Sequence, residues 1–164
     1  MRSQKAVPDR DESRDAAIAR LARLVDGEVT IGHSEPMMLL LTGDADGYPR
    51  HCALSRTELE VVGPSLHAAL HARRTVANLE RDGAAVLVAV DQAEIVSFRL
   101  VVQAIVRADG PVGVRLDIVA VEADSLGIDL TAPSFVPTTE LARSEHWDRT
   151  RSVLTALRSS GTVS

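Results

Sequence analysis

The feature that most constrains the fold is a succession of short apolar runs in the middle of the chain, between Met37 and Val121. Apolar runs of about four to eight residues bounded by turn residues are typical of β-strands. Consecutive parallel strands would each need a crossover of about a dozen or more residues, and most segments between these runs are shorter. The pattern therefore predicts six or seven antiparallel strands. They are Met38–Thr42, Arg50–Ser55, Glu58–Val62, Ser65–His71, Ala84–Val90, Glu94–Arg107 and Val114–Ala123.

Turn residues support these strand boundaries. The segment Gly43–Pro49 is dense in glycine and aspartate and is expected to join the first two strands as a hairpin. Gly63 and Pro64 separate the third strand from the fourth, and an Asp-Gly-Pro turn at 109–111 separates the last two. We therefore expect a β-rich (α+β) fold with an antiparallel barrel over about residues 35–125.

Three segments have helical rather than strand periodicity. From Ser13, apolar residues recur at three- and four-residue intervals and predict a helix that ends near Gly27. A short helix is expected over about Thr75–Asp82, and Gly83 is placed to end it. A C-terminal helix is expected over about residues 144–159. Its apolar face would dock on the barrel through Trp147, Val153, Leu154 and Leu157.

The length of 164 residues suits one domain. Residues 1–12 are polar and charged, and we expect them to form a flexible tail ahead of a single domain over 13–164. Ser144 is the expected N-cap of the C-terminal helix, because its side chain could accept a hydrogen bond from the first turn.

Charge and composition exclude two classes of partner. Acidic residues outnumber basic ones by 23 to 18, which gives a formal net charge of −5. This is the wrong sign for a surface coated for nucleic acid. The longest apolar run, Ala84–Val90, is far shorter than the roughly 20 residues that span a bilayer. We expect neither a nucleic-acid partner nor a membrane segment.

The single cysteine, Cys52, bears on the compartment. One cysteine forms no internal disulfide and no cysteine-based metal site, which agrees with a reducing compartment. The first residues are followed by no apolar stretch of the kind that makes a secretory signal. We therefore expect a cytoplasmic protein. Cys52 and His51 do not form a nucleophile pair in this reading, since adjacent strand residues point to opposite faces.

Two histidines raise the question of a metal. His67 and His71 are four residues apart and share one face of either a strand or a helix. A metal site normally needs three or four ligands, and no third ligand stands at a fixed spacing from this pair. Asp44 and Asp46 could be ligands of a calcium site, but aspartate is common in turns because its side chain hydrogen-bonds to the local backbone. We expect no metal site.

The segment 66–79 contains the most informative combination. A strand leads through the adjacent Arg73 and Arg74 directly to the predicted helix start at Thr75. Unpaired backbone N–H groups at a helix start favour an anion, so two guanidiniums there indicate a phosphate site. The alternative is that the two arginines are solvated turn residues and that Thr75 is simply the N-cap.

These features together resemble a known family. The turn 46–50 with its Gly and Pro, the strand after it, the basic turn, the helix with Asn78 and Leu79, and the valine-rich strand 84–90 are similar to the pyridoxamine 5′-phosphate oxidase-like, FMN-binding split-barrel proteins. The resemblance covers about residues 35–125. It implies a six-stranded antiparallel split β-barrel with flanking N- and C-terminal helices.

The resemblance also implies a function. Two subunits would associate as a homodimer, with FMN in a groove at their interface, and the protein would be an oxidoreductase acting on a small-molecule substrate. The cofactor would carry the hydride while the protein supplies orientation and electrostatics, so no catalytic residue is assigned. Carried over position by position, the implied contacts to phosphate and flavin are Arg50, Ser55, His71, Arg73, Arg74 and Thr75.

Two alternatives remain open at this stage. A deazaflavin could replace FMN, as in related split barrels. The chain could instead be a cofactor-free binding or scaffold module. Two departures from the family pattern favour this second alternative, namely Thr75 where many members carry a basic residue and Ala69 where many carry a hydroxyl.

Overall fold

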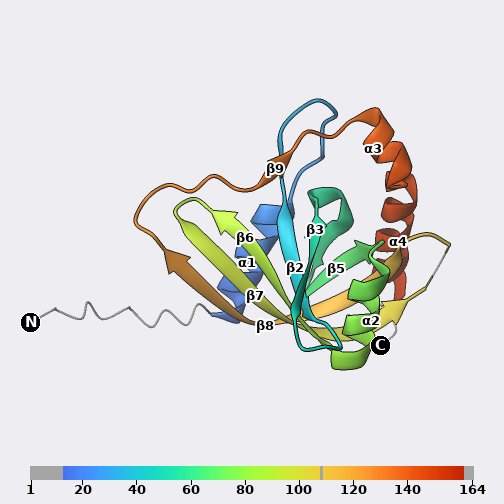
Figure 1. Ribbon diagram of the computed structural model, residues 1–164, viewed down its shortest axis with the longest axis horizontal. Helices are drawn as coiled ribbons and strands as arrows, with labels where there is room; N and C mark the ends of the chain where they lie inside the picture. The colour runs from blue at the N-terminus through green and yellow to red at the C-terminus, as the bar shows by residue number, and fades with distance from the viewer. Residues whose placement is uncertain (1–12, 108, 161–164) are drawn as a thin grey trace, which may run out of the picture.

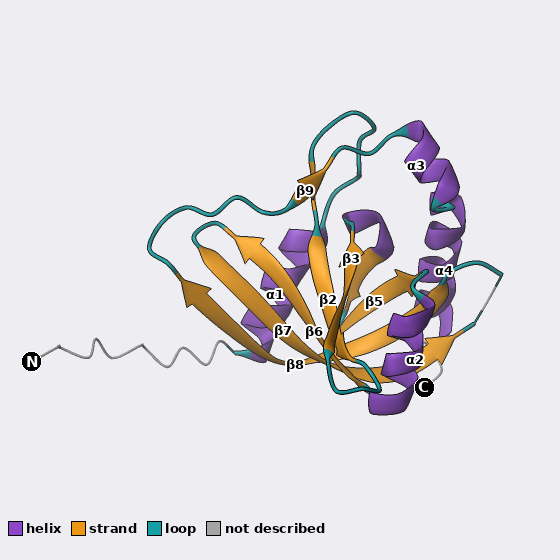
Figure 2. Ribbon diagram, viewed as in Figure 1, coloured by secondary structure: helices purple, strands orange, loops and turns teal. Residues whose placement is uncertain are grey.

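The computed structural model describes residues 13–107 and 109–160. Figures 1 and 2 show a strongly curled sheet with helices along its sides. The tail expected over residues 1–12 lies outside the described residues.

All seven apolar runs form strands of one antiparallel sheet. Its strand order is β3-β2-β6-β7-β8-β5-β4, and each neighbouring pair is antiparallel. The strands are β2 (Met38–Gly43), β3 (Pro49–Leu54), β4 (Leu59–Val62), β5 (Ser65–Leu70), β6 (Ala84–Asp91), β7 (Glu94–Val106) and β8 (Val112–Ser125). The α+β, strand-rich class is confirmed. The count of six strands implied by the family is short by one, because the four-residue β4 joins the sheet at its edge.

A second, two-stranded sheet was not predicted. It pairs β1 (Glu35–Pro36) with β9 (Ser134–Phe135). Strands of two residues have no measurable periodicity, and the partners lie about a hundred residues apart in the sequence. Only the tertiary fold brings them together.

The first two helices follow the predicted segments closely. Helix α1 (Arg14–Val25) begins after Ser13, whose side chain accepts a hydrogen bond from the Ala16 amide. Helix α2 (Arg73–Asp82) ends at Gly83, which has a φ of 66°. One expectation about α2 is wrong: its N-cap is Ala72, so Thr75 lies inside the first turn. Thr75 does not serve as the cap because the helix begins two residues earlier.

The C-terminal helical region differs more from the prediction. It consists of α3 (Thr139–Ser144) and α4 (Trp147–Ser160). Ser144 is not the N-cap of the long helix, because it is the last residue of α3. The N-cap of α3 is Thr138, whose side chain accepts a hydrogen bond from the Leu141 amide. Residues 145 and 146 separate the two helices, and His146 has a left-handed φ of 48°. No helix in the described part of the chain is long and apolar enough to cross a membrane.

The core lies inside the curled sheet and is closed by α1 and α2. Leu21 of α1, Leu79 of α2 and Phe98 of β7 are at most 1% exposed. Helix α4 packs on the other face of β5, where Ala69 meets three of the predicted docking side chains. Gly113 of β8 permits this close approach, since a Cβ there would lie 2.9 Å from Val153.

Candidate functional site

Strand β3 and the start of α2 come together on the inner side of the sheet. In the β2–β3 register, Arg50 pairs with Thr42 and Cys52 pairs with Leu40. Thr42 and Leu40 are buried, so the alternation of a strand turns Arg50 and Cys52 inward as well. The sequence predicted Arg50 as a site residue and did not predict Cys52.

A set of hydrogen bonds fixes this geometry. The buried Asn78 amide of α2 donates to Thr42 Oγ1 at 3.0 Å and to Asp44 Oδ1 at 2.9 Å. Arg81 donates to Asn78 Oδ1 at 3.2 Å and to the Gly43 carbonyl at 2.5 Å. The β2–β3 hairpin is therefore clamped to α2, and the Asn78 of the family-like motif has a structural role.

Three polar atoms at this junction are buried without a hydrogen-bond partner. They are Arg50 Nε, His71 Nε2 and Thr75 Oγ1, and all three belong to residues that the resemblance implied as cofactor contacts. Leaving a buried donor or acceptor unpaired costs about 1–3 kcal/mol, so native proteins rarely do so without a reason. Arg50, His71 and Thr75 therefore each contain a buried polar atom whose hydrogen-bonding capacity the described residues leave largely unused.

The start of α2 adds positive charge to this place. No side chain caps the helix at Ala72, and the first turn holds no acidic residue. Arg73 and Arg74 are both exposed there. Uncapped amide groups and the helix dipole already favour an anion, and a guanidinium can bind a phosphate through two parallel hydrogen bonds.

Cys52 lies beside this cluster but is not poised as a nucleophile. Burial raises the pKa of its thiol above 9.0, and the nearby Glu58 carboxylate raises it further. A weak hydrogen bond between the Thr75 side chain and the sulfur lowers this pKa, and the nearby charge of Arg50 lowers it as well. His51 is exposed on the other face of β3, as the alternation of strand side chains predicts.

Ser55 has a different environment from the other predicted residues. It starts the short 3-10 helix η1 (Arg56–Glu58) and forms a capping box with Glu58. Its hydroxyl contacts Thr57 Oγ1 at 2.5 Å and Glu58 Oε2 at 3.0 Å. Burial raises the pKa of Glu58. The Ser55 hydroxyl is thus engaged within its own turn, whereas Thr75 and Arg50 present unpartnered atoms.

The fourth unpartnered atom of the described residues, His67 Nδ1, lies outside the site. His67 is on β5, and the charges that act on it are Glu60, Arg115 and Arg158. Residues 13–107 and 109–160 contain no group of three or more His, Cys, Asp or Glu side chains that could hold a metal ion.

Comparison with known proteins shows a shared fold. No protein-family model matches the chain, and no curated protein matches its sequence. HupZ of Group A Streptococcus matches with a TM-score of 0.50 and 13% identity over 69% of this chain and 98% of that chain.

Two further solved structures match with lower scores. The styrene monooxygenase flavin reductase of Pseudomonas putida S12 has a TM-score of 0.48 and 9% identity, covering 57% of this chain and 84% of its own. A Clostridium acetobutylicum protein of the pyridoxinephosphate oxidase family has a TM-score of 0.46 and 13% identity, covering 76% and 96%. The likeness to HupZ concerns the fold alone.

Proposed function

We propose that the chain binds FMN with its phosphate at the start of α2 and acts as an oxidoreductase. The observation that carries the proposal is the set of unpartnered buried atoms on Arg50, His71 and Thr75 beside an uncapped, basic helix start. A flavin reductase and a protein of the pyridoxinephosphate oxidase family are among the solved structures that the chain resembles.

The residues present suit a phosphate. Arg73 and Arg74 are exposed and can move onto an anion without losing packing. Thr75 Oγ1 and Arg50 Nε can each donate one hydrogen bond from a buried position. A hydrogen bond to a charged group stabilises by about 1.5–3 kcal/mol, so a few of them suffice for firm binding.

When bound, FMN would supply hydride transfer chemistry that no side chain provides. The role of the protein would be to orient the cofactor and to exclude water. The hydrogen bond from Asn78 to Thr42 joins α2 to β2, the strand that pairs with β3. The Cys52 thiol, protonated because burial raises its pKa, presents a neutral surface to the ligand.

The outer face of the strands whose inner face carries the site is largely apolar. Five apolar side chains share the outer face of β3, β2 and β6, because Leu39 pairs with Ala53 and Val88 while Leu41 pairs with Val86. All five are half-buried or exposed in the single chain. An apolar strip of this kind is a typical protein interaction surface. We propose that it forms a homodimer interface, and a monomer in sedimentation at micromolar concentration would contradict this.

The test of the proposed function is a double substitution at the helix start. Arg73→Ala with Arg74→Ala removes two charge-assisted contacts, so FMN affinity should fall by at least about a hundredfold. Stability should hardly change, because exposed arginines contribute little. The matched control is Arg143→Ala with Arg149→Ala, which removes the same charge from two exposed positions. Arg81 is unsuitable as a control because it joins α2 to the hairpin.

The colour of the purified protein and its thermal stability with FMN separate the alternatives. A protein that is purified yellow and releases FMN on denaturation would support the proposal. A bound chromophore with a deazaflavin absorption spectrum would replace FMN by that cofactor. A colourless protein that gains no thermal stability from excess FMN would be a cofactor-free scaffold, because a ligand that binds only the folded state must stabilise it.

A further inference from the structure

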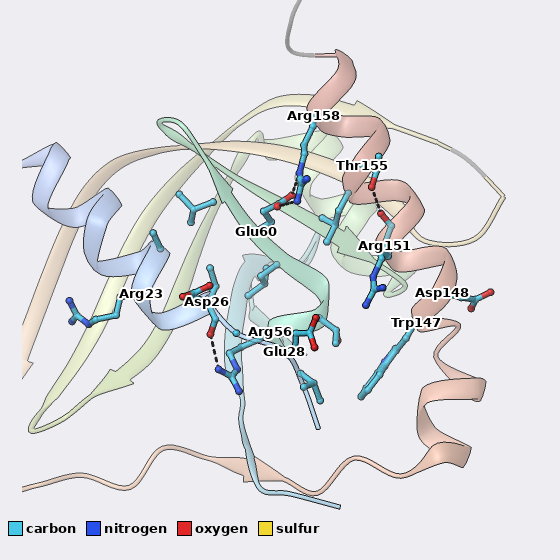
Figure 3. Close-up of a pocket in the computed structure, with 18 residues that line it drawn as sticks. Arg23, Asp26, Glu28, Arg56, Glu60, Trp147, Asp148, Arg151, Thr155 and Arg158 are labelled. Atoms are coloured by element: carbon cyan, nitrogen blue, oxygen red, sulfur yellow. Dashed lines mark hydrogen bonds and ion pairs between the residues drawn. The ribbon is translucent and has the colours of Figure 1, made fainter. Parts of the chain in front are cut away.

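A second cleft lies away from the start of α2. It has a volume of about 970 Å³ and is formed by the end of α1, the loop after it, η1, β4 and α4. Figure 3 shows α1 on one side of the cleft and α4 on the other, with β4 between them. The cleft shares no lining residue with the proposed FMN site, so its function is a separate question.

The floor of this cleft is the free edge of the sheet. Strand β4 is the last in the strand order and pairs only with β5. Leu59, Glu60 and Val61 all line the cleft, although successive side chains of a strand point to opposite faces. The cleft therefore follows the edge itself and not one face of β4. Such an edge presents unpaired N–H and C=O groups to any extended chain that reaches it.

Most arginines along the cleft are already neutralised. Arg23 pairs with Asp91 at 2.9 Å. Arg56 pairs with Glu35 at 2.5 Å. Arg158 forms an ion pair with Glu60. These side chains hold the walls in place and leave little positive charge for a ligand.

The remaining charged groups favour a cation. Asp26 and Glu28 line the cleft and are exposed, and neither carboxylate is in an ion pair among the described residues; Arg56 donates only to the Asp26 backbone carbonyl, at 2.7 Å. Arg151 also lines the cleft and forms no ion pair within residues 13–107 and 109–160, while Asp148 points away from the cleft in Figure 3. Trp147 extends from α4 toward the cleft, and an indole face attracts a Lys or Arg side chain. The excess of free carboxylates agrees with the overall charge of −5, which would attract a basic partner.

We propose that this cleft binds an extended basic peptide segment as an additional strand beside β4. The peptide backbone would pair with the free edge, in the manner of strand addition. A basic side chain would lie on Trp147 near Glu28, and apolar side chains of the peptide would contact the apolar parts of the walls. Four residues of β4 span about 13 Å at roughly 3.3 Å per residue, which sets the recognised segment at about four to six residues.

The test uses the fluorescence of Trp147, which is the single tryptophan of the sequence. The full chain is titrated with a blocked hexapeptide of alternating lysine and valine. A saturable change in emission is expected, weaker at high salt because the charges are partly exposed. The same hexapeptide with glutamate in place of lysine should not bind. A version with N-methyl groups at alternate residues should bind at least about tenfold more weakly, because it lacks the donors for strand pairing.

Variants locate the binding. Asp26→Asn and Glu28→Gln should each weaken binding by about two- to fivefold, as expected for one partly exposed ion pair. Asp124→Asn, an equal change of charge at an exposed position of β8, should leave it unchanged. Equal binding of the acidic or N-methylated peptide would overturn the proposal. The proposal would also be overturned if no peptide binds and the Asp26 and Glu28 variants instead change the sedimentation of the free protein. A second copy of the chain would then occupy the cleft.

Discussion

Replacing Thr75 by valine separates the stability of the fold from the binding of the ligand. Thr75 is fully buried in the first turn of α2, and its Oγ1 has no oxygen or nitrogen partner; the group it acts on is the Cys52 thiol, which is only a weak hydrogen-bonding group. Valine has nearly the same shape but no hydroxyl. The substitution therefore removes an unsatisfied polar atom without opening a cavity.

The substitution is expected to raise the stability of the ligand-free protein and to lower its affinity for FMN. An unpaired buried polar group costs about 1–3 kcal/mol, so the ligand-free Thr75→Val protein should be more stable by roughly 1 kcal/mol or more. For a chain of this size that corresponds to a rise in Tm of about 2–4 °C. Affinity for FMN should fall by about 10- to 150-fold, because one hydrogen bond to a charged phosphate, of about 1.5–3 kcal/mol, is lost.

The assay is thermal unfolding without ligand, followed by FMN titration of the same samples. Thr150→Val is the matched control: Thr150 is equally buried, but its hydroxyl donates to the carbonyl of His146, the residue before α4, at 3.5 Å. The control should not gain stability and should bind FMN normally. If Thr75→Val loses stability, its hydroxyl has a partner within the fold. If its FMN affinity is unchanged, the hydroxyl does not contact the ligand, and the reasoning fails.

Three further predictions concern Asn78, His67 and Cys52. Asn78→Ala should destabilise the protein by about 2–3 kcal/mol, because the hydrogen bonds from the Asn78 side chain to Thr42 and Asp44 are lost. The measurement is the midpoint of urea unfolding, and an unchanged midpoint would contradict the structural role of Asn78. Burial lowers the pKa of His67 below 6.5, so the unfolded chain binds more protons than the folded one, and stability should decline as the pH falls below about 6.5. His67→Gln should reduce this dependence of stability on pH. An equally steep dependence in the variant would assign it to other groups. Burial raises the pKa of Cys52, so iodoacetamide should modify the native protein slowly at neutral pH and faster above about pH 9, as followed by mass spectrometry; rapid modification at neutral pH would show a thiolate.

Local sequence patterns determined the elements of this fold. Each apolar run between turn residues became a strand, because short segments between runs leave antiparallel pairing as the solution. Ser13 and Gly83 mark helix ends as expected, since capping depends on a few neighbouring residues. The basic turn before α2 was also visible, because strand, arginines and helix are contiguous.

Contacts between distant segments decided the rest. The pairing of β1 with β9, the division of the C-terminal helical region at His146, and the clamp between Asn78 and Thr42 have no local signature. The unpartnered state of Thr75 Oγ1 depends on every neighbour that could have bonded to it. The cleft along β4 exists because α1 and α4, from opposite ends of the chain, stand on either side of one sheet edge. Periodicity reports which face of an element is buried, and only the three-dimensional arrangement decides what that face meets.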